Sequence, residues 1–119
     1  MINILVCDDD KEIVEAIEIY LSQDGYRIYK AYDGAQAIRI LDKEDIHLLI
    51  MDIMMPKMSG IEATEKIREL SVAPVLFLTA KSFVADKERA YSSGGDDYVV
   101  KPFSSVELLM KVESLVRRY

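Results

Sequence analysis

Carboxylates stand directly after two apolar segments of this sequence, at the points where buried strands would end. Asp52 follows the apolar run 48–51, and three consecutive aspartates at 8–10 follow the run 2–7. Because a lone carboxylate is costly to bury, each should lie at a strand end, where a site can form. Acidic pockets of this kind bind hard cations such as Mg2+, which take oxygen ligands. One of the carboxylates is also available as a nucleophile.

A hydroxyl and an ammonium follow two further apolar runs. Thr79 comes directly after the run 75–78, and Lys101 comes directly after the run 98–100. In a doubly wound sheet, ligands bind outside the carboxyl ends of the strands. Both side chains would therefore lie beside the carboxylates, where they would hold the oxygens of an incoming anion, most naturally a phosphoryl group.

The elements that must position these side chains alternate regularly along the chain. Short apolar segments alternate with segments in which apolar residues recur at helical spacing. The strands are expected at 2–7, 27–31, 48–51, 75–78 and 98–100. Strands buried on both faces, with helices between them, predict a parallel sheet covered on both sides. The expected fold is a single doubly wound α/β domain over residues 1–119, with five strands and five flanking helices.

Four of the expected helices begin with the spacing of a capping box, in which an N-cap acceptor precedes an acid or amide by three residues. The four pairs are Asp9 with Glu12, Asp33 with Gln36, Ser59 with Glu62, and Ser104 with Glu107. The helix expected near 82–93 lacks this spacing and has a thin apolar face. It is therefore expected to be the least firmly held helix and the element that moves.

Composition excludes several classes of protein. The 119 residues carry a net charge of −6 and include a single cysteine. Such acidity argues against nucleic-acid binding by this segment itself, which would need a positive surface. No apolar run is long enough to span a membrane, and the start of the chain lacks a secretory signal pattern. A lone cysteine fits a reducing compartment, so the cytoplasm is the expected location.

Groups of residues in a fixed order resemble the receiver domain of two-component response regulators. They are Asp8-Asp9, Asp52-x-x-Met55-Pro56-x-x-Ser59-Gly60, Thr79-Ala80, and Gly95-Asp96-Asp97-Tyr98-x-x-Lys101-Pro102-Phe103. The resemblance covers nearly the whole chain, and its later groups are most similar to the OmpR/PhoB-type subfamily. It implies the flavodoxin-like, CheY-like fold with strand order 2-1-3-4-5.

The resemblance also implies a role for the acidic residues. Asp52 would be the phospho-acceptor, taking a phosphoryl group from the phosphohistidine of a sensor histidine kinase. Mg2+ would be the cofactor, bound by Asp9, Asp52 and the backbone carbonyl of Met54, and by Asp8 directly or through water. Met54 offers no polar group to orient an attacking water, so a long-lived acyl phosphate is expected.

The remaining matched positions would read out the phosphorylation. By resemblance, Thr79 and Lys101 would contact the phosphoryl group, and Tyr98 would be an aromatic switch that turns inward as Thr79 moves. A cis peptide bond before Pro102 is also implied. The domain would act as a regulatory switch rather than as a turnover enzyme.

The subfamily resemblance extends the expectation to partners. It implies a winged-helix DNA-binding domain after this segment, and a homodimer formed on phosphorylation through the fourth helix, fifth strand and fifth helix. DNA would be bound only by that second domain. The charged candidates on the dimer face are Lys87, Glu88, Asp96, Asp97, Glu107, Lys111 and Arg118. The alternative is a stand-alone receiver that acts by partner binding or phosphorelay.

Several of these residues also have a purely structural interpretation. Asp9 or Asp10 would cap the first helix, Glu107 would serve as a capping partner, and Tyr98 would be a half-buried strand aromatic. His47, the only histidine, is expected to be a residue at the solvent edge of a strand. Cys7 is expected to be a small buried hydrophobe.

Three other classes of function lack their signatures. A haloacid-type phosphatase would need a second aspartate two residues after the first, where Met54 stands. A flavodoxin-like electron carrier would need a phosphate loop rich in serine, threonine and glycine after the first strand. A dinucleotide-binding enzyme would need the motif G-x-G-x-x-G, which the sequence does not contain.

Overall fold

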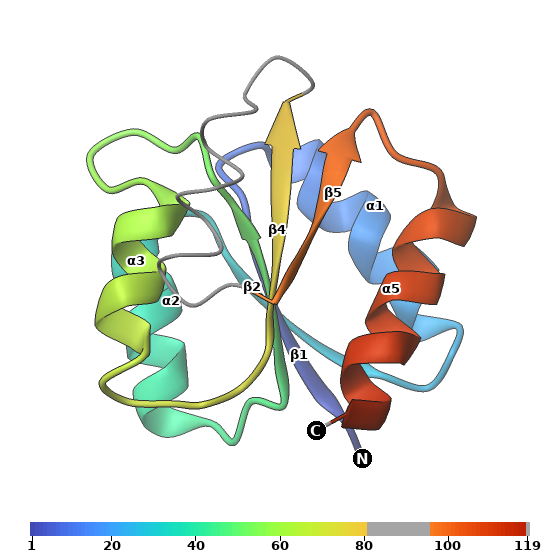
Figure 1. The fold of residues 1–119 in the computed structure, drawn as a ribbon, viewed down its shortest axis with the longest axis horizontal. Helices are drawn as coiled ribbons and strands as arrows, with labels where there is room; N and C mark the ends of the chain where they lie inside the picture. The colour runs from blue at the N-terminus through green and yellow to red at the C-terminus, as the bar shows by residue number, and fades with distance from the viewer. Residues whose placement is uncertain (81–95, 119) are drawn as a thin grey trace.

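The computed structural model describes residues 1–80 and 96–118, which form a parallel five-stranded sheet between two layers of helices (Figure 1). The strands are β1 (Asn3–Cys7), β2 (Arg27–Ala31), β3 (Leu48–Asp52), β4 (Val75–Ala80) and β5 (Asp97–Lys101). Every neighbouring pair is parallel, and the order across the sheet is β2-β1-β3-β4-β5. The predicted doubly wound fold and its strand order are confirmed.

The helices divide between the two faces of the sheet. They are α1 (Lys11–Ser22), α2 (Gly34–Lys43), α3 (Gly60–Ile67) and α5 (Ser105–Arg118). In Figure 1, α2 and α3 cover one face, and α1 and α5 cover the other. The further helix expected near 82–93 lies outside the described residues.

The core consists of two apolar layers, one on each face of the sheet. Alternate residues of the central strands point to opposite faces, so that Leu5, Leu49 and Phe77 pack in one layer and Ile4, Ile50 and Leu76 pack in the other. All six of these side chains are fully buried. The three central strands therefore form a rigid support for whatever their carboxyl ends carry.

Three of the predicted strands extend further than the apolar pattern indicated. β3 includes Asp52, β4 includes Thr79, and β5 includes Lys101. The pattern ends at the last apolar side chain, but the backbone hydrogen bonds of a sheet do not depend on side-chain polarity. Asp52 and Lys101 are therefore the last residues of their strands and Thr79 is the last but one, so the sheet positions all three.

The N-caps agree with the prediction except at the first helix. Asp33, Ser59 and Ser104 each accept a hydrogen bond from the backbone N–H three residues on. At α1 the predicted capping-box pair of Asp9 with Glu12 is wrong. Of the two candidate caps, Asp10 is confirmed, because its Oδ1 accepts from the Glu12 N–H at 3.0 Å. The cause is a turn in which Asp8 accepts from the Asp10 N–H at 2.9 Å, which moves the helix start one residue later.

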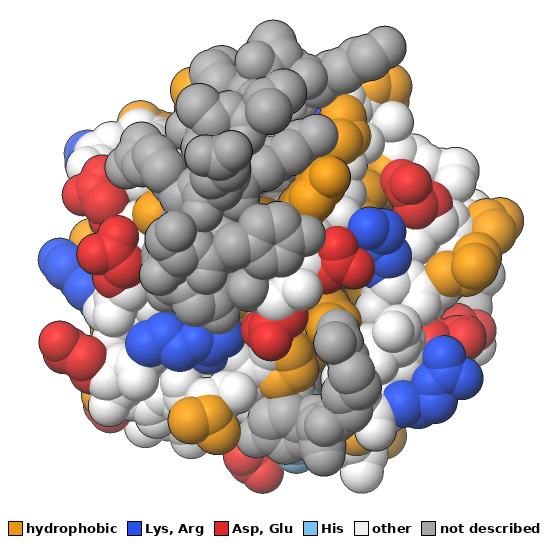
Figure 2. All heavy atoms as spheres, in the orientation of Figure 1, with side chains coloured by type: hydrophobic (Ala, Val, Ile, Leu, Met, Phe, Trp, Pro, Cys, Tyr) orange, Lys and Arg blue, Asp and Glu red, His pale blue; other side chains and the backbone are white. Residues whose placement is uncertain are grey.

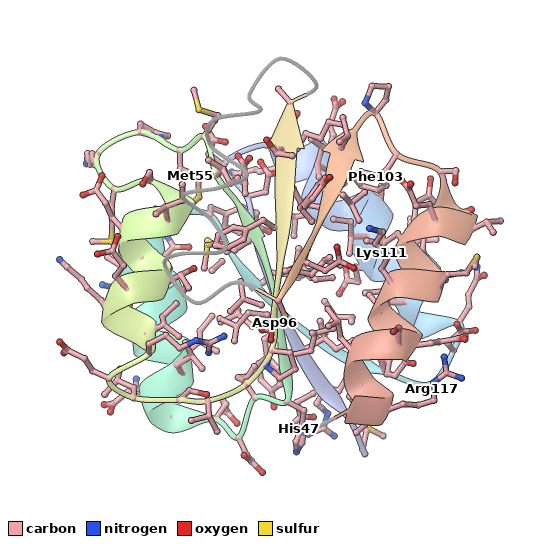
Figure 3. The ribbon with its side chains drawn as sticks, viewed as in Figure 1. His47, Met55, Asp96, Phe103, Lys111 and Arg117 are labelled. Carbon is pink, nitrogen blue, oxygen red and sulfur yellow. The ribbon has the colours of Figure 1, made fainter. Side chains whose placement is uncertain are left out.

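The surface mixes charges of both signs. In Figure 2, lysine or arginine and aspartate or glutamate side chains alternate over the described part of this face, with small apolar areas between them. His47, labelled in Figure 3, lies beside the start of β3, and its Nδ1 accepts from the Asn3 N–H at 2.9 Å. Among the described residues, no helix is long and apolar enough to cross a membrane.

Candidate functional site

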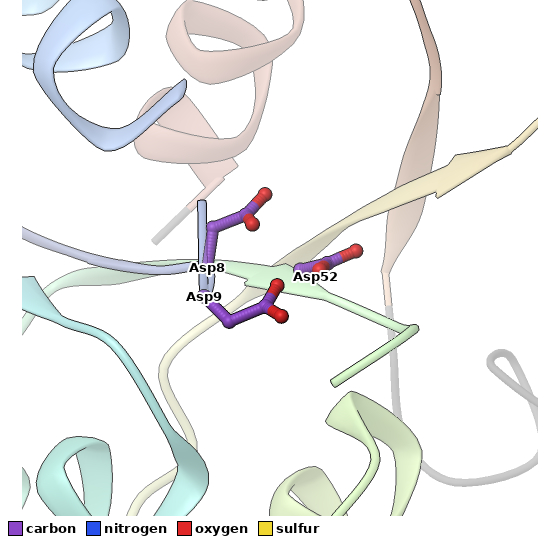
Figure 4. A group of neighbouring side chains, drawn as sticks. All are labelled: Asp8, Asp9 and Asp52. Carbon is purple, nitrogen blue, oxygen red and sulfur yellow. The ribbon is translucent and has the colours of Figure 1, made fainter. Parts of the chain in front are cut away.

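Three carboxylates from two neighbouring strand ends form one cluster. Asp8 and Asp9 follow β1, Asp52 ends β3, and one oxygen atom from each lies within 4.8 Å of the other two. In Figure 4 the three carboxylates project from the strand ends toward the same side. Asp8 and Asp52 are buried, whereas Asp9 is exposed to solvent. Three carboxylates at the ends of neighbouring strands, one of them exposed to solvent, suit a hard cation such as Mg2+, which binds a few carboxylates and keeps several waters.

Lys101 bridges the two buried carboxylates. Its Nζ lies 2.9 Å from Oδ2 of Asp8 and 3.3 Å from Oδ1 of Asp52. Burial lowers the pKa of the Lys101 ammonium, but the hydrogen bond to Asp8 and the charges of both carboxylates outweigh this and raise the pKa overall. The ammonium therefore stays charged. The peptide bond from Lys101 to Pro102 is cis, as expected.

Asp52 is an unusual carboxyl group because it is buried beside a second acid. Burial, followed by the negative charge of Asp8, raises the pKa of Asp52 from 3.8 to about 7, although Lys101 and the Met54 N–H act in the opposite direction. The burial of Asp52 removes water that would otherwise solvate its anion. Without a bound metal ion, the Lys101 ammonium therefore does not neutralise all of the negative charge of the three carboxylates.

Two more predicted residues stand around Asp52. Thr79 is buried near the end of β4, and its hydroxyl donates to the Ala80 carbonyl at 3.3 Å. The Met54 N–H donates to Oδ1 of Asp52 at 3.3 Å, which orients the carboxylate, while the Met54 side chain is 53% exposed. Thr79 is thus placed one strand from Asp52, since β3 and β4 are paired in the sheet.

Tyr98 and the predicted dimer face lie together along β5 and α5. Tyr98 is half-buried, and the Lys111 ammonium lies 5.3 Å from the centre of its ring. Lys111 also forms an ion pair with Asp97 at 3.1 Å, which joins two residues of the predicted face within one chain. Glu107 is exposed on α5. Lys87 and Glu88 lie outside the described residues, as does the side chain of Arg118.

Asp96 has a different environment from the rest of the predicted face. Its Oδ2 accepts from the Val75 N–H at 2.8 Å and from Arg68 at 3.3 Å. Figure 3 shows Asp96 beside the start of β5, away from Lys111. Asp96 thus helps to join β4 and β5 at the amino-terminal ends of these strands, at the opposite end of the sheet from the carboxylates.

Sequence reasoning missed two local features of the site. The first is the turn in which the Asp8 carboxylate accepts a hydrogen bond from the Asp10 N–H. Aspartate often forms such a turn with the N–H two residues later, so the residue type at position 8 was the available signal. The second is the close contact of Gly60 with the backbone of Asp52. Gly60 belonged to the motif, but a sequence alone does not show which backbone a glycine touches.

Comparisons with known proteins identify the family. The model of the response regulator receiver domain matches residues 4–113. The chain is 45% identical over 117 residues to the uncharacterized transcriptional regulatory protein YrkP of Bacillus subtilis, covering 98% of this chain and 50% of that protein. It is 40% identical over 117 residues to the regulatory protein VanR of Enterococcus faecium, covering 98% of this chain and 51% of VanR.

The fold comparison agrees with the sequence comparison. The response regulator TrrA of Thermotoga maritima, solved in complex with Mg2+ and BeF, superposes with a TM-score of 0.87 at 36% identity, covering 97% of this chain and 99% of that one. The chain spans about half the length of the curated relatives it matches. Because the family match extends over residues 4–113, the chain belongs to the response regulator receiver domains.

Proposed function

We propose that this domain is a phosphorylation-dependent switch in which Asp52 accepts a phosphoryl group from the phosphohistidine of a sensor histidine kinase. The observation that carries this proposal is the position of the Asp52 carboxylate. It ends a central strand, beside two further carboxylates and 3.3 Å from the Lys101 ammonium. Family membership supports the same role, because the receiver domain of a two-component system is the partner of a kinase.

The proposed reaction is a direct transfer between two nucleophilic atoms. A carboxylate oxygen of Asp52 attacks phosphorus, the P–N bond to the kinase imidazole breaks, and its electron pair stays on the ring nitrogen. An acyl phosphate remains on Asp52. Phosphoryl transfer depends on positioning and charge stabilisation more than on covalent help from the protein. Lys101 and the Thr79 hydroxyl would contact the transferred oxygens and stabilise their charge.

The donor set fits Mg2+ as the cofactor. Asp8, Asp9, Asp52 and the Met54 carbonyl would hold the ion, and all three side chains offer carboxylate oxygens. When bound, Mg2+ supplies the positive charge that Lys101 alone does not provide and binds a phosphoryl oxygen. The complex of TrrA with Mg2+ and BeF supports this assignment by similarity.

The output we propose is control of transcription through a second domain. Both cited relatives are regulatory proteins about twice the length of this chain, and YrkP is described as a transcriptional regulator. The acyl phosphate would add negative charge and acceptor oxygens at one point. It would shift a pre-existing equilibrium through its contacts with Thr79, with Tyr98 following. Homodimerisation through the face that includes Asp97 and Lys111 would then act on an attached winged-helix DNA-binding domain.

The test is incorporation of phosphate in the purified domain. Incubation with acetyl phosphate and Mg2+, followed by intact mass spectrometry, should show the gain of one phosphoryl group. The Asp52→Asn variant should gain none, and omission of Mg2+ should prevent the gain in the native protein. Equal labelling of the native protein and Asp52→Asn would overturn the proposal. Because Met54 carries no group that orients water, the label should persist well beyond seconds after removal of acetyl phosphate.

A further inference from the structure

We propose that Gly60, the first residue of α3, is a positioning residue that sets the placement of the Asp52 carboxylate and the Met54 carbonyl. This inference rests on the proposed function, because it concerns the Mg2+ site and the phospho-acceptor. Gly60 itself offers no chemical group to either. Its contribution is the absence of a side chain at a point where two backbone segments meet.

The contact between Gly60 and Asp52 leaves no space for a methyl group. A Cβ atom on Gly60 would lie 2.1 Å from the carbonyl oxygen of Asp52 and 2.8 Å from its carbonyl carbon. Ordinary van der Waals contacts of such an atom begin at 3.4 Å. The obstacle is backbone, which does not rotate away as a side chain would. A methyl group here therefore forces α3 and the end of β3 apart by about 1 Å or more.

Hydrogen bonds show that this contact closes the loop between β3 and α3. The Gly60 N–H donates to the Ile53 carbonyl at 3.0 Å, and the Ile53 N–H donates to the Leu78 carbonyl of β4 at 3.0 Å. Thr64, which is fully buried in α3, donates its hydroxyl to the Gly60 carbonyl at 2.8 Å. Gly60 is thus fixed from both sides, to the sheet and to its own helix.

Met54 lies inside the loop that Gly60 closes. Its N–H holds Oδ1 of Asp52 at 3.3 Å, and its carbonyl is the proposed backbone ligand for Mg2+. A displacement of Gly60 is transmitted to Asp52 directly, and to Met54 through Ile53. A misplacement of about 1 Å in reacting groups costs a reaction on the order of a hundredfold in rate. A side chain at Gly60 is therefore expected to lower Mg2+ affinity and the rate of phosphorylation, although Gly60 itself supplies no ligand atom.

The test compares two identical chemical changes, Gly60→Ala and Gly25→Ala. Gly25 follows α1 and has φ +85, so alanine there is strained, yet its Cβ would meet nothing within 4 Å. Both variants should have a lower thermal midpoint than the native domain. Mg2+ affinity, measured by isothermal titration calorimetry, should fall about tenfold or more in Gly60→Ala, and phosphorylation by acetyl phosphate should slow ten- to a hundredfold. Gly25→Ala should retain native values of both.

The outcomes separate this inference from the proposed function. Native Mg2+ affinity and native phosphorylation in folded Gly60→Ala would overturn the inference, as would equal losses in Gly25→Ala. If Gly60→Ala does not fold, Thr64→Val carries the test, because it removes one anchor of Gly60 while keeping the shape of the side chain. It should lower Mg2+ affinity two- to fivefold, and an unchanged affinity would overturn the inference. Failure of the native domain to accept phosphate would instead count against the proposed function.

Discussion

The ammonium of Lys101 lies 2.9 Å from Oδ2 of Asp8, a carboxylate that has no exposed surface. The same ammonium lies 3.3 Å from Oδ1 of Asp52, so one positive charge forms ion pairs with two buried carboxylates at the ends of different strands. One charge cannot balance two in a site with little water, and the residual negative charge is what a divalent cation would neutralise. The pairing also ties β5 to β1 and β3 at the edge where the site lies.

Lys101→Met should destabilise the metal-free domain. Methionine replaces the aliphatic part of the lysine side chain with one of similar length, but it leaves two buried carboxylates without their cation. Because Lys101 is partly exposed, the loss of unfolding free energy should be about 1–3 kcal/mol, less than for breaking a fully buried pair. Urea unfolding in EDTA at pH 8 measures it. Lys30→Met, which breaks an exposed pair with Glu18, should leave the midpoint unchanged. A similar midpoint for native and Lys101→Met would show that the bridge contributes nothing.

Asp52→Asn should stabilise the metal-free domain in a pH-dependent manner. The pKa of Asp52 is raised from 3.8 to about 7 in the folded state, so the folded state binds its proton more tightly than the unfolded state does. This contribution to stability is present below pH 4 and is lost as the pH rises through 7. The amide should therefore add about 1–3 kcal/mol at pH 8 and much less at pH 5. Urea unfolding at both pH values tests it, and a gain independent of pH would contradict the role of ionisation.

Asp9→Asn should remove the stabilisation by Mg2+ without harming the fold. Asp9 is exposed, so its replacement costs the metal-free domain little. In the native domain, Mg2+ at a hundred times its dissociation constant should add about 2.7 kcal/mol to the unfolding free energy. The matched control is Asp10→Asn, because asparagine still caps α1 and Asp10 is not in the cluster. Thermal unfolding with and without Mg2+ distinguishes them, and an equal Mg2+ response in both variants would remove Asp9 from the site.

Lys57→Gly should stabilise the loop between β3 and α3. Lys57 has φ +69, a conformation that costs an L-residue roughly 1–2 kcal/mol and glycine almost nothing. Part of that gain is offset by the larger entropy of glycine in the unfolded chain, so a net gain of about 0.5–1 kcal/mol is expected. Urea unfolding measures it. Lys66→Gly, inside α3, should instead cost about 1 kcal/mol, which controls for loss of a surface lysine.

Cys7 should resist alkylation in the folded domain. Burial, with a smaller contribution from the charge of Asp33, raises the pKa of the Cys7 thiol to about 12, so the reactive thiolate is rare at neutral pH. Its Sγ lies 3.3 Å from the Asp33 carbonyl and 3.7 Å from Sδ of Met55. Iodoacetamide at pH 8 should label it only after unfolding. Rapid labelling of the native domain would show that the end of β1 opens readily.

The positions of the strands along the sequence were predictable from runs of apolar and β-branched residues, whereas their order in the sheet was implied only by the family resemblance. β2 is an instructive case, since its predicted range, 27–31, is the observed one, although it is an edge strand. The first helix start was not predictable at the level of one residue. Asp9 and Asp10 both satisfy the chemistry of an N-cap, and only the contact between Asp8 and the Asp10 N–H decides between them.

The site was predictable to the level of which residues meet, because the carboxyl ends of parallel strands share one edge. The double contact of Lys101 with Asp8 and Asp52 was not, since it depends on side-chain conformations. Neither was the pairing of Lys111 with Asp97 and with the ring of Tyr98. The sequence analysis placed Asp97 and Lys111 on the predicted dimer face and Tyr98 on the fifth strand. The distances between their side chains depend on packing, which the sequence does not show.

The central claim is that Asp52 carries an acyl phosphate, and borohydride reduction tests it most directly. Reduction converts an aspartyl phosphate to homoserine with loss of phosphate, which marks the position in a peptide map. The domain is treated with acetyl phosphate and Mg2+, reduced, digested and sequenced by mass spectrometry. The account predicts homoserine at position 52 alone, and none when Mg2+ is omitted. Homoserine at position 8 or 9, or phosphate recovered on His47, would contradict it.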